Sequence, residues 1–432
     1  MKKLVLVVCL LMAGRVWALD LNGYLKTDWR MRVDGSGQFT YNENDFDLKL
    51  KSALGSGASA FADLELKNIG FSTTTNLYSL SLYDKTRVGP WTLELKEGYL
   101  DLTGFLLKGL DLRIGKQRLT WGTADRLNPT DNINPLDFSD ITDLGKRLGT
   151  NSIKATYYLG DCYFQGVYVP VFVPAVLPSD YQSMYPFPAG IPLSDTLVLP
   201  TTNFTNSMFA LKAGGRIFGF DSSISYFYGF DNIPAQKELT YVMPTGTLAG
   251  LGVKLEYPKI QTIGLDAAGS IGDVGIWAEI GYTIPEKFDT IAYIISPLPS
   301  SNTGTLLQNP YTKFTIGADY TFPVVGIYAN IQYCHGFFDE RANDIRDYLV
   351  AEVERKFFSD KLKIALAGFL EMDFRGGAHF FPSFAFYPEI SYYPFEATEI
   401  LLGAYFLDSW ENGKFYLSRT SDEMYLKIKY SF

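Results

Sequence analysis

Alternation of apolar and charged residues with a period of two is the feature that most constrains the fold of this chain. Between residues 21 and 33, Leu21, Leu25 and Trp29 fall on one side of the alternation, and charged residues occupy the other side. Successive side chains of a β-strand point to opposite faces, so this segment predicts a strand with one face suited to lipid and one to water. The same pattern recurs at residues 44–54, 58–69, 274–284, 312–322 and 361–372.

The connections between the expected strands alternate in length, which is typical of transmembrane β-barrels. Counting strands between these connections predicts an all-β fold, a single closed antiparallel transmembrane β-barrel of about 18 strands, with 16 as the alternative. The strand near residues 249–271 is long enough to be split. Short turns are expected at residues 55–57, 160–161, 218–220, 272–273, 323–326 and 359–360. Longer, irregular loops are expected at residues 34–43, 70–90, 119–150, 174–206, 231–248, 285–311, 337–344, 373–382 and 408–421.

Composition and hydropathy agree with a barrel. The mean hydropathy is +0.01, which is far too low for a bundle of membrane helices. After the N-terminal apolar run, no segment approaches the roughly 20 apolar residues that a membrane-spanning helix needs. Strands cross a membrane only in a closed barrel, where every backbone hydrogen bond has a partner. The 29 Tyr and 32 Phe residues are numerous enough to form aromatic girdles at both membrane interfaces.

The first 18 residues have the features of a secretory signal peptide. Lys2 and Lys3 precede an apolar run from residue 4 to residue 13, and Val16 and Ala18 suit cleavage after about Ala18. Cleavage would leave residues 19–432 as the barrel domain, with 35 basic and 47 acidic residues and a net charge of −12. An acidic, exported chain argues against a nucleic-acid partner and is compatible with the outer membrane.

The C-terminal ten residues alternate to the last position. Residues 424, 426, 428, 430 and 432 are apolar or aromatic, and the chain ends at Phe432. This segment resembles the closing strand of bacterial outer-membrane barrels. The resemblance implies that the barrel-assembly machinery recognises the strand ending in Phe432, and that outer-membrane lipid surrounds the folded protein.

Residues 109–150 carry the most distinctive local motif. An expected strand runs into a polar loop with two Asn-Pro steps, each followed two residues later by Asp, which is typical of a defined turn structure. The segment resembles a porin-like family of outer-membrane β-barrel proteins of Gram-negative bacteria. The matching residues are Gly115 and Gln117 in Gly-x-Gln, Trp121 and Gly122 in Trp-Gly, and Asn134, Pro135 and Asp137 in Asn-Pro-x-Asp.

That resemblance implies a channel whose inward-folded loop narrows the pore. By this analogy the constriction-loop candidates are Trp121, Asp125, Arg126, Asp131, Asp137 and Asp140. A loop that only packs on the rim is the alternative. The acidic residues of the loop also invite a calcium-site reading, but they lack the dense spacing of a dedicated calcium loop, so no metal or cofactor is expected.

Charged residues on the strands must face a lumen, because a Lys or Arg on the lipid face at mid-bilayer costs roughly 2–4 kcal/mol. An 18-stranded barrel is too wide for side chains alone to fill, so an aqueous channel is favoured. The pore-lining candidates are Lys26, Asp28, Arg30, Arg32, Asp47, Lys49, Asp63, Glu65, Arg113, Glu279, Asp319, Lys427 and Lys429.

These patterns favour an outer-membrane porin for passive diffusion of small solutes. One alternative is a selective uptake channel for apolar or aromatic compounds, suggested by the apolar loops at 174–193 and 291–299. Another is a surface adhesin that uses the long loops. An enzyme is not expected: the chain has only two His, and neither His335 nor His379 has a Ser in a matching local motif. The oligomeric state, monomer or homotrimer, is left open by the sequence.

Overall fold

The computed structural model describes residues 19–75, 80, 86–140, 143–177, 191–377, 379–416 and 419–432. The expected signal peptide, residues 1–18, therefore lies outside the described residues, as do positions 178–190 of the apolar loop 174–193. Among the described residues, no helix is long and apolar enough to cross a membrane.

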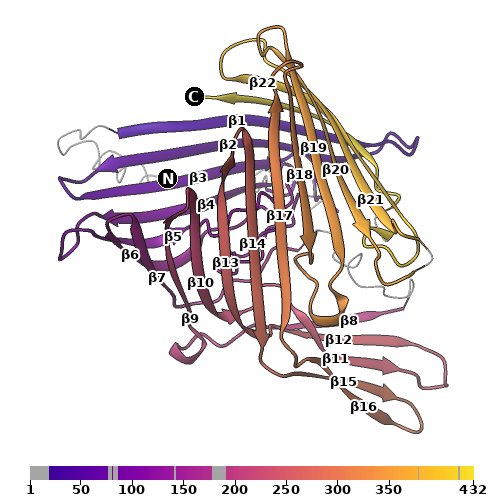
Figure 1. Ribbon diagram of the computed structural model, residues 1–432. Helices are drawn as coiled ribbons and strands as arrows, with labels where there is room; N and C mark the ends of the chain where they lie inside the picture. Colours follow the sequence, from indigo (N-terminus) through magenta and orange to yellow (C-terminus); the bar gives the residue numbers. More distant parts are fainter. Residues whose placement is uncertain are drawn as a thin grey trace.

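In the described residues, eighteen antiparallel strands form one closed sheet (Figure 1). The sheet closes because β1 pairs with β2 on one side and with the last strand, β23, on the other. The predicted barrel of 18 strands is therefore confirmed. Its strands are β1 (Leu19–Arg32), β2 (Phe39–Ala53), β3 (Ala58–Ile69), β4 (Trp91–Leu102), β5 (Leu110–Gln117), β6 (Thr150–Leu159), β7 (Cys162–Val169), β9 (Met208–Ile217), β10 (Phe220–Phe230), β13 (Lys259–Ile271), β14 (Val274–Pro285), β17 (Tyr311–Phe322), β18 (Ile327–His335), β19 (Asp347–Phe357), β20 (Leu362–Met372), β21 (Ser383–Tyr392), β22 (Thr398–Ser409) and β23 (Glu423–Ser431).

The C-terminal residue completes the seam of the barrel. Gly23 and Phe432 exchange two backbone hydrogen bonds, each 3.0 Å long. The Phe432 ring stacks on Phe46 of β2, with 6.2 Å between the ring centroids. A Cβ atom at Gly23 would lie 2.8 Å from the Phe432 ring and 2.1 Å from the Asp47 carbonyl oxygen. Glycine at position 23 therefore lets the terminal ring cross β1 and reach its partner.

The period of two in the sequence becomes an inner and an outer face of the wall. On β1, Leu25 and Trp29 are 51% and 45% exposed, whereas Asp28 is fully buried. Apolar side chains that remain exposed around a barrel form the band that meets lipid in membrane barrels. The short turns lie where the alternation predicts them, for example between β6 and β7 and between β13 and β14.

Three of the loops that were expected to be irregular contain strands, so this part of the prediction is wrong. Strands β8 (Leu193–Val198), β11 (Ala235–Val242), β12 (Gly250–Glu256), β15 (Phe288–Ile295) and β16 (Ser300–Leu307) form a second sheet. We call it the loop sheet; Figure 1 shows it projecting from one end of the barrel. It contains the parallel pairs β11–β15 and β8–β12, which join loops far apart in the chain. Such pairings leave no local signal in the sequence.

One feature of the loop sheet was anticipated and another corrects the prediction. The long segment near 249–271 is split between β12 and β13, at Tyr257 and Pro258, because proline has no backbone N–H to continue a ladder. The apolar stretch 291–299 belongs to the β15–β16 hairpin and its turn instead of an irregular loop.

Candidate pore and its inner loop

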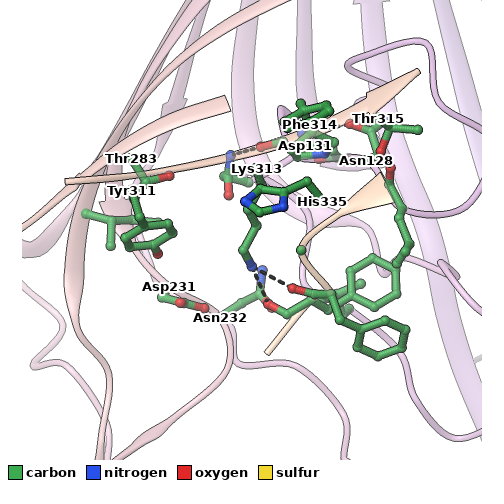
Figure 2. A pocket seen from close by; sticks show the side chains of 18 of the residues that line it. Asn128, Asp131, Asp231, Asn232, Thr283, Tyr311, Lys313, Phe314, Thr315 and His335 are labelled. Atoms are coloured by element: carbon green, nitrogen blue, oxygen red, sulfur yellow. Dashed lines mark hydrogen bonds between the residues drawn. The ribbon is translucent and has the colours of Figure 1, made fainter. Parts of the chain in front are cut away.

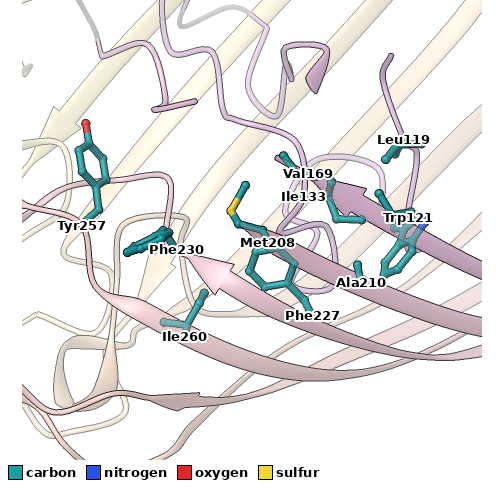
Figure 3. Packing of buried hydrophobic residues seen from close by; sticks show 11 residues of the cluster. Leu119, Trp121, Ile133, Val169, Met208, Ala210, Phe227, Phe230, Tyr257 and Ile260 are labelled. Atoms are coloured by element: carbon teal, nitrogen blue, oxygen red, sulfur yellow. The ribbon is translucent and has the colours of Figure 1, made fainter. Parts of the chain in front are cut away.

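The segment between β5 and β6, residues 118–149, is called the inner loop. Its first part packs against the inward face of β7, β9 and β10. Trp121 is 2% exposed, and its Nε1 donates to Gln165 of β7 at 2.7 Å. Figure 3 shows Trp121 and Ile133 beside Met208 and Ala210 within one cluster of buried apolar side chains. This candidate residue therefore fixes the loop to the wall through an apolar contact.

Glu279 of β14 binds the backbone of the inner loop. Its carboxylate accepts hydrogen bonds from the Thr123 and Ala124 N–H groups at 2.8 and 3.0 Å, and from the Thr130 N–H and hydroxyl at 2.7 Å each. Glu279 is 2% exposed. A buried carboxylate with four donors is a fully satisfied acceptor, and removing it would orphan all four donors. Glu279 was expected to line a pore; the structure places it under the loop.

The Trp-Gly motif is explained by this contact. Gly122 has a φ of +80°, in the left-handed region that side chains disfavour. A Cβ atom there would lie 2.4 to 2.5 Å from both Glu279 oxygens. Only glycine allows the chain to turn over the carboxylate at this distance.

Asn134 of the Asn-Pro-x-Asp motif joins the start of the inner loop to its middle. Its Oδ1 accepts from the Leu119 N–H at 3.0 Å, and its Nδ2 donates to the Leu119 carbonyl and to Asp131. The buried Arg147 adds an N–H bond of 3.2 Å to the Asn134 carbonyl and lies 3.7 Å from Asp131. The motif residues therefore hold the loop in one shape.

Asp137, the last motif residue, also stabilises the conformation of the inner loop. It accepts from the Ser139 N–H at 3.0 Å and pairs with Lys146 at 2.8 Å. Burial alone would raise the pKa of Asp137, but these hydrogen bonds and the Lys146 charge outweigh burial and lower its pKa below the usual range.

The inner loop also contacts strands on other parts of the wall. Thr315 of β17 donates to the Leu127 carbonyl at 2.8 Å, and Asn330 of β18 donates to Asp125 at 2.9 Å. Further pairs join Arg126 to Glu352 of β19 at 3.3 Å, and Asp140 to Arg30 of β1 at 2.7 and 2.8 Å. The six constriction candidates therefore belong to a loop that contacts inward-facing groups of β1, β7, β14, β17, β18 and β19.

Most pore-lining candidates gather on one sector of the wall, formed by β1 to β5 and β23. We call it the paired sector, because its charges alternate in sign and contact one another. The pairs are Lys26–Asp45 (2.6 Å), Lys49–Asp63 (3.7 Å), Arg113–Asp101 (2.6 Å), Arg30–Asp28 (2.7 Å) and Lys427–Asp28 (3.8 Å). Lys429 lies 4.7 Å from the centre of the Tyr24 ring, and Arg32 donates to the Thr420 carbonyl. Asp319 lies outside the sector, on β17, and accepts from Tyr328.

Lys96 is a member of the paired sector that sequence reasoning missed. Its Nζ lies 2.9 Å from Asp47 and 3.3 Å from Glu65. The signal was present, since Leu93 and Leu95 alternate with Glu94 and Lys96. Lys96 was missed because it is the extra residue where the pairing of β3 with β4 shifts register: Asp63 is opposite Glu97, and Leu64 is opposite Leu95. The stretch before β4 also has no clear alternation.

Two of the cavities in the described part of the chain adjoin the inner loop. Figure 2 shows the first, where Lys313 donates to the Phe337 carbonyl at 2.6 Å near Tyr311, Asp231 and His335. Its volume of about 60 Å³ suits a few water molecules. The second, of about 330 Å³, lies between Asp125, Arg126 and Asp143 of the loop and the inner wall of β18 to β21. Only the second has the size of a solute site.

The two histidines lie apart. His335 Nδ1 is 2.7 Å from Asp347, which also accepts from Tyr333, whereas His379 stacks on Trp410 at 3.9 Å. Within the described ranges, Cys162 and Cys334 form no disulfide. In the part of the chain that the structure describes, no group of three or more His, Cys, Asp or Glu side chains could hold a metal ion.

The fold is similar to that of several solved bacterial structures. OccAB3 of Acinetobacter baumannii matches with a TM-score of 0.52 and 10% identity, over 96% of this chain and 99% of that chain. OpdK of Pseudomonas aeruginosa, solved with vanillate, has a TM-score of 0.51 and 10% identity over 96% and 98% of the two chains. OccK9 (OpdG) of the same organism has a TM-score of 0.50 and 11% identity over the same shares.

At these identities the similarity establishes the barrel fold. No protein-family model matches the chain, and no curated protein matches its sequence.

Proposed function

We propose that this protein is an outer-membrane channel through which small solutes diffuse passively, and that the inner loop sets the size limit. The observation that carries the proposal is the loop's attachment to inward-facing groups around the barrel, above all the four hydrogen bonds to Glu279. A wide barrel with charged inner walls holds water, and a loop fixed across it narrows the aqueous path. OpdK, whose fold is similar, was solved with vanillate, a small organic molecule.

The pore-lining candidates are proposed to tune which ions pass. Side chains of the paired sector, such as Lys49 and Arg113, are 44% and 26% exposed and so can meet water in the lumen. We do not propose a catalytic function, because the described contacts of His335 and His379 include no Ser, Thr or Cys nucleophile.

The remaining expectations are part of the same proposal. The chain is exported by a signal peptide cleaved after about Ala18 and is inserted into outer-membrane lipid by the barrel-assembly machinery, through the strand ending at Phe432. We also propose that the protein assembles as a homotrimer, and the mass of the detergent-solubilised protein tests this. The porin-like motif of residues 115–137 is proposed to mark the anchored loop.

Single-channel conductance of the refolded mature protein in a planar bilayer tests the function. The variant lacks residues 123–140, and a matched control lacks residues 243–249 in the turn between β11 and β12. We expect ion-conducting steps that grow when the inner loop is shortened and stay unchanged in the control. A silent bilayer for all three proteins would contradict the channel and favour a closed surface protein.

A further inference from the structure

The second cavity carries an unbalanced charge. It is lined by three carboxylates, Asp125, Asp143 and Glu352, and by one guanidinium, Arg126. Arg126 is already 3.3 Å from Glu352. The two other carboxylates make no ion pair with the residues that the structure describes, so the cavity presents a net negative charge.

Neutral donors hold one of these carboxylates in place. Asn330 and Gln332 donate to Asp125 at 2.9 and 3.4 Å. Amide donors orient a carboxylate without cancelling its charge, unlike the Lys–Asp pairs of the paired sector. Asp143 is exposed and lines the same cavity. A cation entering the cavity would therefore meet oriented, uncompensated oxygens.

An aromatic side chain supplies an independent observation. Tyr387 of β21 lines the cavity and is 8% exposed, and its buried hydroxyl has no hydrogen-bond partner among the described residues. Buried hydroxyl groups in folded proteins are nearly always hydrogen-bonded. The phenol oxygen can accept an N–H bond, and the Phe369 side chain adds apolar surface to the lining.

The first cavity does not compete for this role. Its lining balances Asp131 and Asp231 against Arg147 and Lys313, and the Lys313 ammonium is satisfied by two backbone carbonyls. Its volume is about one fifth of that of the second cavity, so a solute larger than a few waters is excluded.

We propose that the second cavity is a binding site for a small organic cation, a primary or quaternary ammonium carried on an apolar or aromatic group. The carboxylates of Asp125 and Asp143 attract the charge, and Tyr387 and Phe369 contact the apolar part. This inference rests on the proposed channel function and names the class of solute that the channel favours.

Calorimetric binding and bilayer recording on the same detergent-refolded protein test the site. The probes are benzylammonium and benzoate, which have a similar ring and opposite charge. The test variant is Asp125→Asn with Asp143→Asn. The control is Asp273→Asn with Asp360→Asn, which removes the same charge at two short turns remote from the loop.

We expect wild type and control to bind benzylammonium and to pass K⁺ in preference to Cl⁻. The test variant should bind it at least about threefold more weakly, since two partly exposed charges are lost. Tyr387→Phe should weaken binding without changing the K⁺ preference. Equal binding of benzoate, or an unchanged affinity in the test variant, would overturn the site even if the protein conducts. Binding without any conduction would support the site and contradict the channel.

Discussion

The inner loop and the loop sheet are both insertions between barrel strands, and they reach order by different means. The inner loop has little regular structure, and its polar groups bind side chains of the wall and of the loop itself, as with Glu279 and Asn134. The loop sheet satisfies its backbone through strand pairing among β8, β11, β12, β15 and β16. A loop fixed by the wall can control the lumen, whereas a self-paired sheet is free to project from it.

We expect Glu279→Ala to have the largest effect on the channel, because it removes the acceptor that fixes the inner loop to the wall. Four donors, two of them on the buried Thr130, would lose their acceptor, at a cost of about 3 kcal/mol to the loop conformation. We expect larger and noisier single-channel currents while the barrel remains folded. Glu354→Ala is the matched control, because Glu354 of β19 pairs with Lys363 of β20 at 3.8 Å and makes no described contact with the inner loop. Unchanged currents in Glu279→Ala would mean that the apolar contacts of Trp121 hold the loop alone.

Gly122→Ala attacks the same contact from the loop side. The added methyl group strains a backbone with φ of +80° and meets both Glu279 oxygens, which should cost about 1–3 kcal/mol. Currents should rise, though less than with Glu279→Ala. Gly246→Ala, at φ of +81° in the turn before β12 with no atom near the added Cβ, is the control for backbone strain. Equal effects of the two alanines would contradict a specific role for the Glu279 contact.

Acid should loosen the inner loop through Asp137. The folded-state pKa of Asp137 is lowered, so its stabilising effect is complete above the unfolded pKa of about 3.9 and is lost as the pH falls through the folded value. Channel noise should therefore rise below about pH 4. Asp137→Asn should remove part of this acid dependence, and Asp34→Asn, in an exposed turn, should leave it intact. A pH profile that is the same for all three proteins would exclude Asp137 as a cause.

We expect the smallest change in conductance when the loop sheet is altered. Replacing residues 296–299, in the turn between β15 and β16, by a Gly-Asn turn removes the exposed Leu298, which is 86% accessible. Conductance should stay within the variation of wild-type channels, because no described contact joins this turn to the inner loop. A large change in conductance or in solute block would mean that the apolar turn acts at the channel entrance, as an apolar-uptake channel requires.

The sequence by itself determined the barrel. The inward and outward faces of β1, the short turns and the closing strand at Phe432 follow from a period of two, because strand geometry alone assigns alternate residues to opposite faces. The same rule did not find β8, β11, β15 and β16, because β8, β11 and β15 have parallel partners in distant segments and β16 pairs with β15 inside a loop that was expected to be irregular. It also missed Lys96, since a register shift separates it from the pattern.

Only the tertiary structure decided what the inner loop touches. The motif from Gly115 to Asp137 indicates an ordered loop, but nothing local connects Gly122 to Glu279, which lies more than 150 positions further along the chain. The unbalanced cavity is of the same kind: Asp125, Glu352 and Tyr387 come from separate parts of the chain. Closure of the barrel brings these distant residues together. Whether a charged side chain has an ion-pair partner therefore depends on the tertiary structure and not on the local sequence.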